Sequence, residues 1–123
     1  MKGDLVIPKL KIDSSVLFEA GAATLQGQVV REELLKIVDF VRSFSPSKLV
    51  IEGHTDSDGD EAANQDLSVR RAEMVRDYLI SNYTEITPEM VSAQGYGESR
   101  PLVRNDTPEN RALNRRIEIV VWE

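Results

Sequence analysis

The chain has 123 residues, which is enough for one domain with its own core and too few for two. Its composition, 41% hydrophobic and 29% charged, is that of a globular protein and excludes the disordered and fibrous classes. The formal net charge of -6 disfavours nucleic acid as a partner. The absence of cysteine excludes disulfides, thiolate zinc sites and cysteine nucleophiles.

Residues 1–10 are predicted to form an N-terminal arm, and residues 11–123 a single α/β domain. No apolar run approaches the roughly 18–20 residues of a membrane span. The segment 1–8 is too short, and too interrupted by Pro8, for a secretory signal. We therefore expect the domain itself to lie outside the membrane, either in a cytoplasmic protein or as a piece of a longer chain.

The first half of the domain is predicted as strand, helix, strand. Lys11–Phe18 is the first strand, and Lys48–His54, which is β-branched and follows a Ser-Pro-Ser turn, is a buried strand. Between them, Gly27–Phe44 is a helix because apolar residues recur at spacings of three and four. These residues are Val30, Leu34, Ile37, Val38 and Val41.

The second half repeats this alternation after an acidic loop at Thr55–Ala63. A long helix is predicted to begin at Asn64 or Asp66, either of which is a suitable N-cap, and to end at Tyr83. The remaining elements are a strand at Met90–Tyr96, a short helix that begins at Thr107-Pro108, and a closing strand at Arg116–Trp122.

The element order is thus β-α-β-α-β-(short α)-β. Strands separated by full helices imply crossover connections, with the helices packed on a sheet face. Two long helices are too few to cover both faces. The sequence therefore predicts a two-layer α/β sandwich, in which a mixed four-stranded sheet carries two long helices on one face.

The long second helix contains an anomaly. Leu67, Arg71 and Val75 are four residues apart and share the helix face that should meet the core. An arginine stays charged when buried, so Arg71 needs an anion. An internal salt bridge or a ligand can supply that anion. Alternatively, the side chain snorkels, so that its charged end reaches water.

Asp56 gives Arg71 a candidate companion. It directly follows the buried strand Lys48–His54, and ligands of α/β sheets bind beyond the carboxyl ends of strands. If Asp56 and Arg71 face one cleft, they form a receptor for a zwitterion. Its ammonium would meet the carboxylate and its carboxylate would meet the guanidinium. The alternative is that the two side chains pair with each other.

Five motifs occur along the chain in a defined order and spacing. They are Leu17-Phe18-Glu19-x-Gly21-x-Ala23-x-Leu25, Gly53-His54-Thr55-Asp56, Asn64-x-x-Leu67-Ser68-x-x-Arg71-Ala72, Gly95-Tyr96-Gly97 and Asn110-Arg111-x-x-Asn114-Arg115-Arg116-Ile117. Together they resemble the OmpA-like C-terminal domain, the peptidoglycan-binding module that is also found in Pal lipoproteins and MotB-type flagellar stator subunits. The resemblance covers Val16–Val121.

The resemblance implies a non-catalytic domain, without a cofactor, that binds the diaminopimelate of a peptidoglycan stem peptide. Glutamate at position 19 departs from the aspartate or asparagine that is common there, and it is one methylene longer. The residues that match the family's binding positions are Asp56, Arg71, Asn64, Leu67, Phe18 and Glu19, with Thr55 and Arg116 in support.

The resemblance also implies a periplasmic domain that anchors a larger envelope protein to the cell wall. The membrane anchor would then lie upstream of this chain. A homodimer is left open. The alternative function is a structural or oligomerisation domain that keeps this fold without binding muropeptide. Retention of both Asp56 and Arg71 argues against that alternative.

The acidic loop admits other interpretations. Asp56-x-Asp58-x-Asp60 resembles the start of a calcium loop, but the sixth and twelfth positions hold Glu61 and Leu67 instead of glycine and glutamate. We therefore expect no metal site there. The loop is either a solvated acidic segment or one that favours cationic ligands.

Two further features are expected to be structural. His54 is the only histidine, so a multi-histidine metal site is excluded, and no motif places a nucleophile beside it. The sequence therefore does not predict an enzyme. Arg111, Arg115 and Arg116 cluster at a helix-to-strand corner, where we expect them to bind nearby carbonyls and carboxylates.

Overall fold

The computed structural model describes residues 10–19, 21–25, 27 and 29–122. Along the chain the elements are β1 (Leu10–Asp13), α1 (Ser14–Leu17), α2 (Val29–Phe44), β2 (Lys48–His54), α3 (Glu61–Asn82), β3 (Val91–Gly95), α4 (Pro108–Asn114) and β4 (Arg116–Trp122). None of the helices in these residues is long and apolar enough to cross a bilayer.

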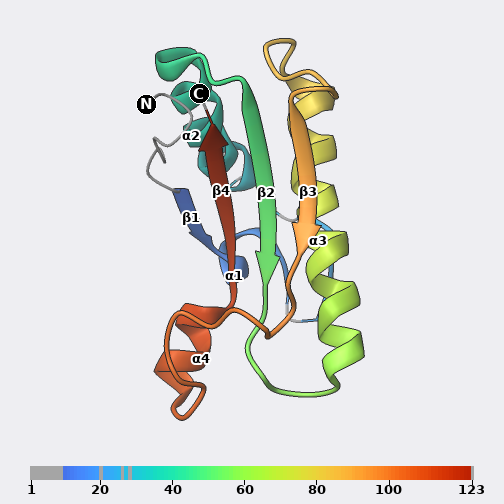
Figure 1. The fold of residues 1–123 in the computed structure, drawn as a ribbon, viewed down its shortest axis with the longest axis vertical. Coiled ribbons are helices and arrows are strands. Elements are labelled where there is room, and N and C mark those ends of the chain that lie inside the picture. Colours follow the sequence, from blue (N-terminus) through green and yellow to red (C-terminus); the bar gives the residue numbers. More distant parts are fainter. Residues whose placement is uncertain (1–9, 20, 26, 28, 123) are drawn as a thin grey trace.

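The strands form one mixed sheet in the order β1-β4-β2-β3. β4 runs antiparallel to both β1 and β2, and β2 runs parallel to β3. The long helices α2 and α3 cover one face of the sheet, and α4 lies at the N-terminal end of β4, which it precedes in the chain (Figure 1). The predicted two-layer sandwich with a mixed four-stranded sheet is confirmed.

The core lies between the sheet and the two long helices. Alternate residues of β2 and β4, such as Ile51 and Ile119, are fully buried, as the two-residue period of a strand requires. The predicted apolar stripe of α2 is buried along its whole length. Burial of this surface is the main favourable term in folding.

Two glycines allow α3 to approach the ends of β2 and β3. A Cβ added at Gly53 would lie 2.2 Å from the backbone oxygen of Ser68, and one added at Gly95 would lie 2.4 Å from the backbone nitrogen of Val69. No larger residue fits without moving the helix. These glycines therefore bring α3 against the edge of the sheet where the loop after β2 begins.

The first strand is shorter than predicted. It ends at Asp13, and Ser14–Leu17 forms a single helical turn instead of the second half of a strand. The physical reason is local capping, because the Asp13 carboxylate accepts a hydrogen bond from the Ser15 backbone N–H at 2.9 Å. The turn carries the chain from the sheet edge across the end of the sheet.

The second long helix begins earlier than predicted. Asp60 is the N-cap and accepts from the Ala63 backbone N–H at 2.9 Å, so α3 starts at Glu61 and not at Asn64 or Asp66. Of the predicted arm, residues 1–9 lie outside the described residues. Leu10 belongs to β1, where it pairs with Ile119.

Candidate functional site

A cleft of about 470 Å³ opens beyond the carboxyl end of β2. Three segments that are distant in sequence meet there: the turn after β1, the loop and first turns of α3, and the junction between α4 and β4. The lining residues are Ser14, Ser15, Phe18, Gly21, Thr55, Asp56, Asp58, Asn64, Leu67, Arg71 and Arg115. Six of the eight residues proposed from sequence therefore lie around one cleft.

Asp56 is buried at the base of the loop, and each of its carboxylate oxygens accepts one hydrogen bond. Oδ1 accepts from the Asp58 backbone N–H at 3.0 Å, and Oδ2 accepts from Nη1 of Arg115 at 2.5 Å. The first bond is part of the loop itself. The second goes to a side chain that keeps 42% of its surface exposed. One oxygen is thus held by the backbone of the loop and the other by a partly exposed cation.

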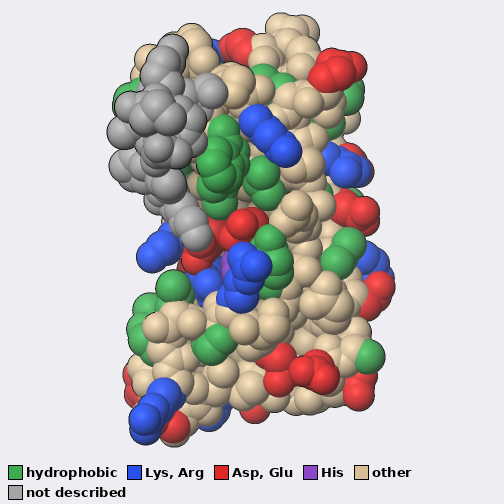
Figure 2. Space-filling view, viewed as in Figure 1, with side chains coloured by type: hydrophobic (Ala, Val, Ile, Leu, Met, Phe, Trp, Pro, Cys, Tyr) green, Lys and Arg blue, Asp and Glu red, His purple; other side chains and the backbone are tan. Residues whose placement is uncertain are grey.

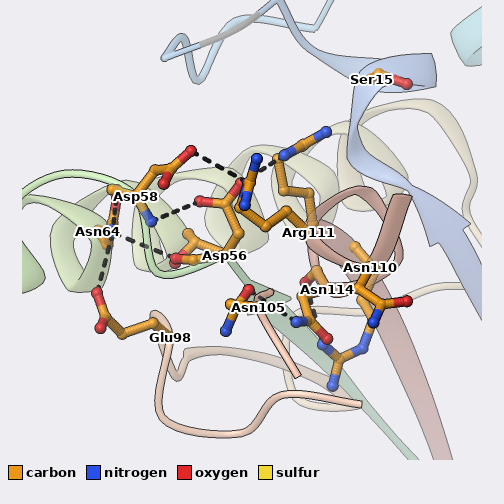
Figure 3. A network of polar contacts seen from close by, with 12 residues as sticks. Ser15, Asp56, Asp58, Asn64, Glu98, Asn105, Asn110, Arg111 and Asn114 are labelled. Carbon is orange, nitrogen blue, oxygen red and sulfur yellow. Dashed lines mark hydrogen bonds and ion pairs between the residues drawn. The ribbon is translucent and has the colours of Figure 1, made fainter. Parts of the chain in front are cut away.

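Asn64 fixes the shape of the loop that carries Asp56. Its Nδ2 group donates to the Asp58 carbonyl at 2.8 Å and to Oε1 of Glu98 at 3.1 Å. Figure 3 shows this network, in which Asn64 binds the Asp58 carbonyl and the Glu98 carboxylate, and Arg111 pairs with the Asp58 carboxylate. The asparagine therefore acts on the site by holding the loop rather than by an unoccupied donor.

Arg71 lies in α3 at the opposite wall and is only 5% exposed. Its Nε donates to the Ala22 carbonyl at 2.8 Å and its Nη2 to the Glu19 carbonyl at 3.1 Å. The guanidinium carbon lies 5.0 Å from the centre of the Phe18 ring, within cation–π range. Burial lowers the pKa of Arg71, and the charge of Arg115 lowers it further.

No ion pair joins Arg71 to a carboxylate within the part of the chain that the structure describes. Two of the sequence-based alternatives are therefore wrong: Arg71 does not form an internal salt bridge there, and it does not pair with Asp56, whose partner is Arg115. The two carbonyls give this buried guanidinium hydrogen bonds, but they are neutral. Its positive charge therefore has no counter-ion in the described residues.

Two of the residues proposed from sequence, Glu19 and Arg116, do not line the cleft with their side chains. The Glu19 side chain is exposed and does not line the cleft; what it contributes is the carbonyl that accepts from Arg71. Arg116 lines a different hollow on the opposite face of the sheet, together with His54 and Glu118. The arginine that reaches the cleft is its neighbour Arg115, which sequence reasoning did not assign to the site.

The position of Arg115 could have been read from the sequence. Side chains alternate between the faces of a strand, and Ile117 is the first residue of β4 that faces the core. Arg115 precedes it by two and shares its side, whereas Arg116 faces the other way. The expectation that this cluster binds nearby acids is confirmed, because Arg111 and Arg115 pair with Asp58 and Asp56.

The outer face of the sheet carries a second group of buried charges. Glu52 and Glu118 are direct cross-strand partners, and so are His54 and Arg116. Nε of Arg116 donates to Oε2 of Glu118, and Nε2 of His54 lies 3.3 Å from Oε1 of Glu52. Acidic and basic side chains meet in the middle of this face (Figure 2). We refer to Glu52, His54, Arg116 and Glu118 as the outer cluster.

The outer cluster has a structural character. Burial lowers the pKa of His54, the charge of Arg116 lowers it further, and Glu52 acts in the opposite direction. The potential ligand atoms of Glu52, His54 and Glu118 lie within 4.8 Å of one another. The guanidinium of Arg116 is bound to one of these carboxylates and opposes a divalent cation there.

A larger hollow, of about 530 Å³, lies against Leu25, Val30 and Tyr78. Among the described residues that line it, the charged ones are Arg31 and Glu32 at the start of α2, and both are exposed. The cleft at Asp56 and Arg71 is smaller, but it combines apolar walls with buried groups of opposite sign. Such convergence of polar groups in an apolar pocket is typical of a ligand site.

Comparison with known proteins shows which family the chain is similar to. Outer membrane porin F of Pseudomonas aeruginosa is 46% identical over 89 residues, covering 72% of this chain and 25% of the porin. The peptidoglycan-binding protein ArfA of Mycobacterium bovis is 38% identical over 90 residues, covering 73% of this chain and 27% of ArfA. The chain thus spans about a quarter of the length of these curated relatives.

Solved structures agree with the sequence comparison. The cell wall anchor of the T6SS from Pseudomonas aeruginosa superposes with a TM-score of 0.81 at 29% identity, covering 93% of this chain and 80% of that chain. The model of the OmpA family matches residues 17–115, which include the cleft residues from Phe18 to Arg115. The chain belongs to the OmpA family.

Proposed function

We propose that this domain binds peptidoglycan non-covalently and that it recognises the zwitterionic end of the diaminopimelate side chain in a stem peptide. The observation that carries the proposal is Arg71. It is buried, it faces the cleft, and its hydrogen bonds go to two backbone carbonyls and not to an acid. A ligand carboxylate would supply the missing counter-ion.

The two walls of the cleft match the two charges of such a ligand. Asp56 is an acceptor for an ammonium group, and Arg71 leaves Nη1 without a hydrogen-bond partner in the described residues. Leu67 and Phe18 supply apolar surface between them for the methylene chain. Diaminopimelate ends in a carbon that carries both an ammonium and a carboxylate, so it satisfies both walls at once.

The names of two relatives support this ligand class. ArfA is named a peptidoglycan-binding protein, and the T6SS structure is that of a cell wall anchor. Neither is named for a catalytic activity. Because the chain spans a quarter of its relatives, we further propose that it serves as the periplasmic wall-binding module of a longer envelope protein.

The test is a calorimetric titration with a diaminopimelate-containing muropeptide. Arg71→Ala and Asp56→Ala should each weaken binding by roughly 2–5 kcal/mol, because each leaves a desolvated charge without its partner. Thermal melts should show that both variants remain folded, since both substitutions leave the apolar side chains of the core between the sheet and the helices in place.

Two residues of the same helix give matched controls. Arg70 and Asp66 pair with each other at 3.0 Å on the exposed face of α3, with side chains 58% and 67% exposed. Arg70→Ala and Asp66→Ala should leave the affinity unchanged. Binding by Arg71→Ala at wild-type affinity would overturn the site. A wild-type domain that binds no muropeptide would favour the structural or oligomerisation role, which sedimentation analysis of the wild type would then examine.

A further inference from the structure

The cleft contains two arginines that are held in different ways. Arg71 is buried and its guanidinium is fixed by two carbonyls of the loop after α1. Arg115 is anchored through its backbone, where its N–H donates to the Arg111 carbonyl and its carbonyl accepts from the Ser14 N–H. Its side chain is 42% exposed, and among the described residues its hydrogen bonds go to one group, the carboxylate of Asp56. Arg71 is thus buried and held by two carbonyls, whereas Arg115 is partly exposed and held by one ion pair.

In the free domain Arg115 occupies the place that a ligand ammonium needs. It donates to Oδ2 of Asp56, while Oδ1 is committed to the backbone N–H of Asp58. An incoming ammonium must displace the guanidinium or share the oxygen with it. Sharing would set two cations side by side in a partly buried cleft, which is unfavourable.

The displaced guanidinium also has a place to go. Arg115 and Arg71 line the same cleft, and Arg115 lies against Asp56. The ammonium and the carboxylate of the proposed ligand are bonded to one carbon, so an ammonium bound at Asp56 brings its carboxylate next to the place where Arg115 lies. A ligand that carries both an ammonium and a carboxylate can displace Arg115 from Asp56 with its ammonium and pair with Arg115 through its carboxylate.

We propose that Arg115 is a specificity-determining residue that exchanges Asp56 for the ligand carboxylate when the ligand binds. The inference rests on the proposed function. It adds a penalty against ligands that carry only an ammonium, such as a stem peptide with lysine. Such a ligand displaces Arg115 from Asp56 but has no carboxylate there with which the guanidinium can pair. Selectivity then comes from a repulsive element as well as from the contact with Arg71.

The experiment measures two affinities for each protein variant. Matched muropeptides that carry diaminopimelate or lysine are titrated by calorimetry at one salt concentration. The wild type should prefer diaminopimelate. Arg115→Gln should reduce this preference by about tenfold, mainly because the lysine muropeptide binds more tightly once Asp56 is released. Arg115→Lys keeps a cation on Asp56 and should keep most of the preference.

Arg111→Gln is the matched control. Arg111 belongs to the same corner and pairs with Asp58 at 3.5 Å, but it does not line the cleft. Arg111→Gln should leave the preference for diaminopimelate over lysine unchanged. If this variant loses as much of the preference as Arg115→Gln does, the effect comes from the change in net charge, and the inference is overturned. A preference that stays within twofold of wild type in Arg115→Gln would overturn it too. In that case wild-type binding of diaminopimelate would still stand, whereas absence of wild-type binding would remove the proposed function itself.

Discussion

Arg71 and Arg116 are buried to the same degree, each 5% exposed, yet they occupy opposite sides of the sheet in opposite electrostatic settings. Arg116 belongs to the outer cluster, where it donates to the Glu118 carboxylate and to the carbonyls of Asn114 and Arg100. Arg71 donates to the carbonyls of Ala22 and Glu19 and, among the described residues, pairs with no acid. Burial alone thus does not separate a structural charge from one available to a ligand; the identity of the partners does.

The difference between the two regions extends to their acids. In the outer cluster, Glu52 and Glu118 are held as cross-strand neighbours, an arrangement that is unfavourable unless cations lie between them. In the cleft, Asp56 is paired with Arg115, whose side chain is 42% exposed. We infer that the outer cluster stabilises the fold, whereas the cleft keeps part of its electrostatic energy for binding.

The largest expected difference between the two regions is the loss of stability when each arginine is replaced. Arg116→Ala removes the guanidinium from a buried ion pair and should lower the free energy of unfolding by about 3 kcal/mol or more. Arg71→Ala breaks two bonds to loop carbonyls and should cost about 1–2 kcal/mol. Urea denaturation measures both. Equal losses in the two variants would show that Arg71 is as structural as Arg116.

The shape of the cation at position 71 is a sharper test of the cleft. Lysine keeps the charge but cannot hold two carbonyls and a carboxylate in one plane. Arg71→Lys should therefore weaken muropeptide binding by about 1.5–3 kcal/mol, less than Arg71→Ala does. Calorimetry at fixed salt decides this, and wild-type affinity in the lysine variant would mean that a point charge suffices.

The outer cluster should also make the stability of the fold depend on pH, through His54. Burial and Arg116 lower the pKa of His54 in the folded state, so the unfolded chain takes up this proton first. The stability contribution is complete above the ordinary histidine pKa of about 6.5 and is lost as the pH falls below it. Denaturation curves between pH 8 and 5.5 measure this slope. His54→Gln should flatten it, and Asp56→Asn should not.

The smallest expected effect concerns a hydroxyl. Oγ of Ser14, at the wall of the cleft, is buried and has no hydrogen-bond partner in the described residues. Ser14→Ala should leave the free energy of unfolding unchanged or raise it by up to about 1 kcal/mol, because nothing is lost with the group. Ser68→Ala is the contrast, since its hydroxyl accepts from the Gly97 N–H at 2.9 Å and donates to the Gln65 carbonyl at 2.8 Å. This variant should be destabilised.

Most of the fold could be predicted because it rests on periodicity. The stripe on α2 and the short β-branched run of β2 each indicate one element and one buried face, and the structure has both. The prediction was wrong where a single capping side chain decided the outcome. Asp13 starts a helical turn inside the predicted strand, and Asp60 starts α3 before the predicted N-caps. Strand and cap residues compete locally, and the sequence pattern does not show which wins.

The site could be predicted in part for the same reason. Helical spacing alone shows that Arg71 faces inward, and the strand end shows where Asp56 lies. The partners of Arg71 could not be predicted, because they are backbone carbonyls of a loop some fifty residues earlier that has no periodic pattern. To predict that Arg115 and not Arg116 reaches the cleft, the alternation of side chains along β4 had to be extended to Arg115, one residue before the strand begins.

The carbonyls that hold Arg71 also bear on the entropy of binding. A long side chain that is free in solution loses about 0.5–1.5 kcal/mol of conformational freedom when a partner immobilises it. The bonds to Ala22 and Glu19 and the contact with the Phe18 ring have already imposed that loss during folding. The guanidinium is therefore preorganised, and a carboxylate that reaches it meets a donor that need not be ordered again.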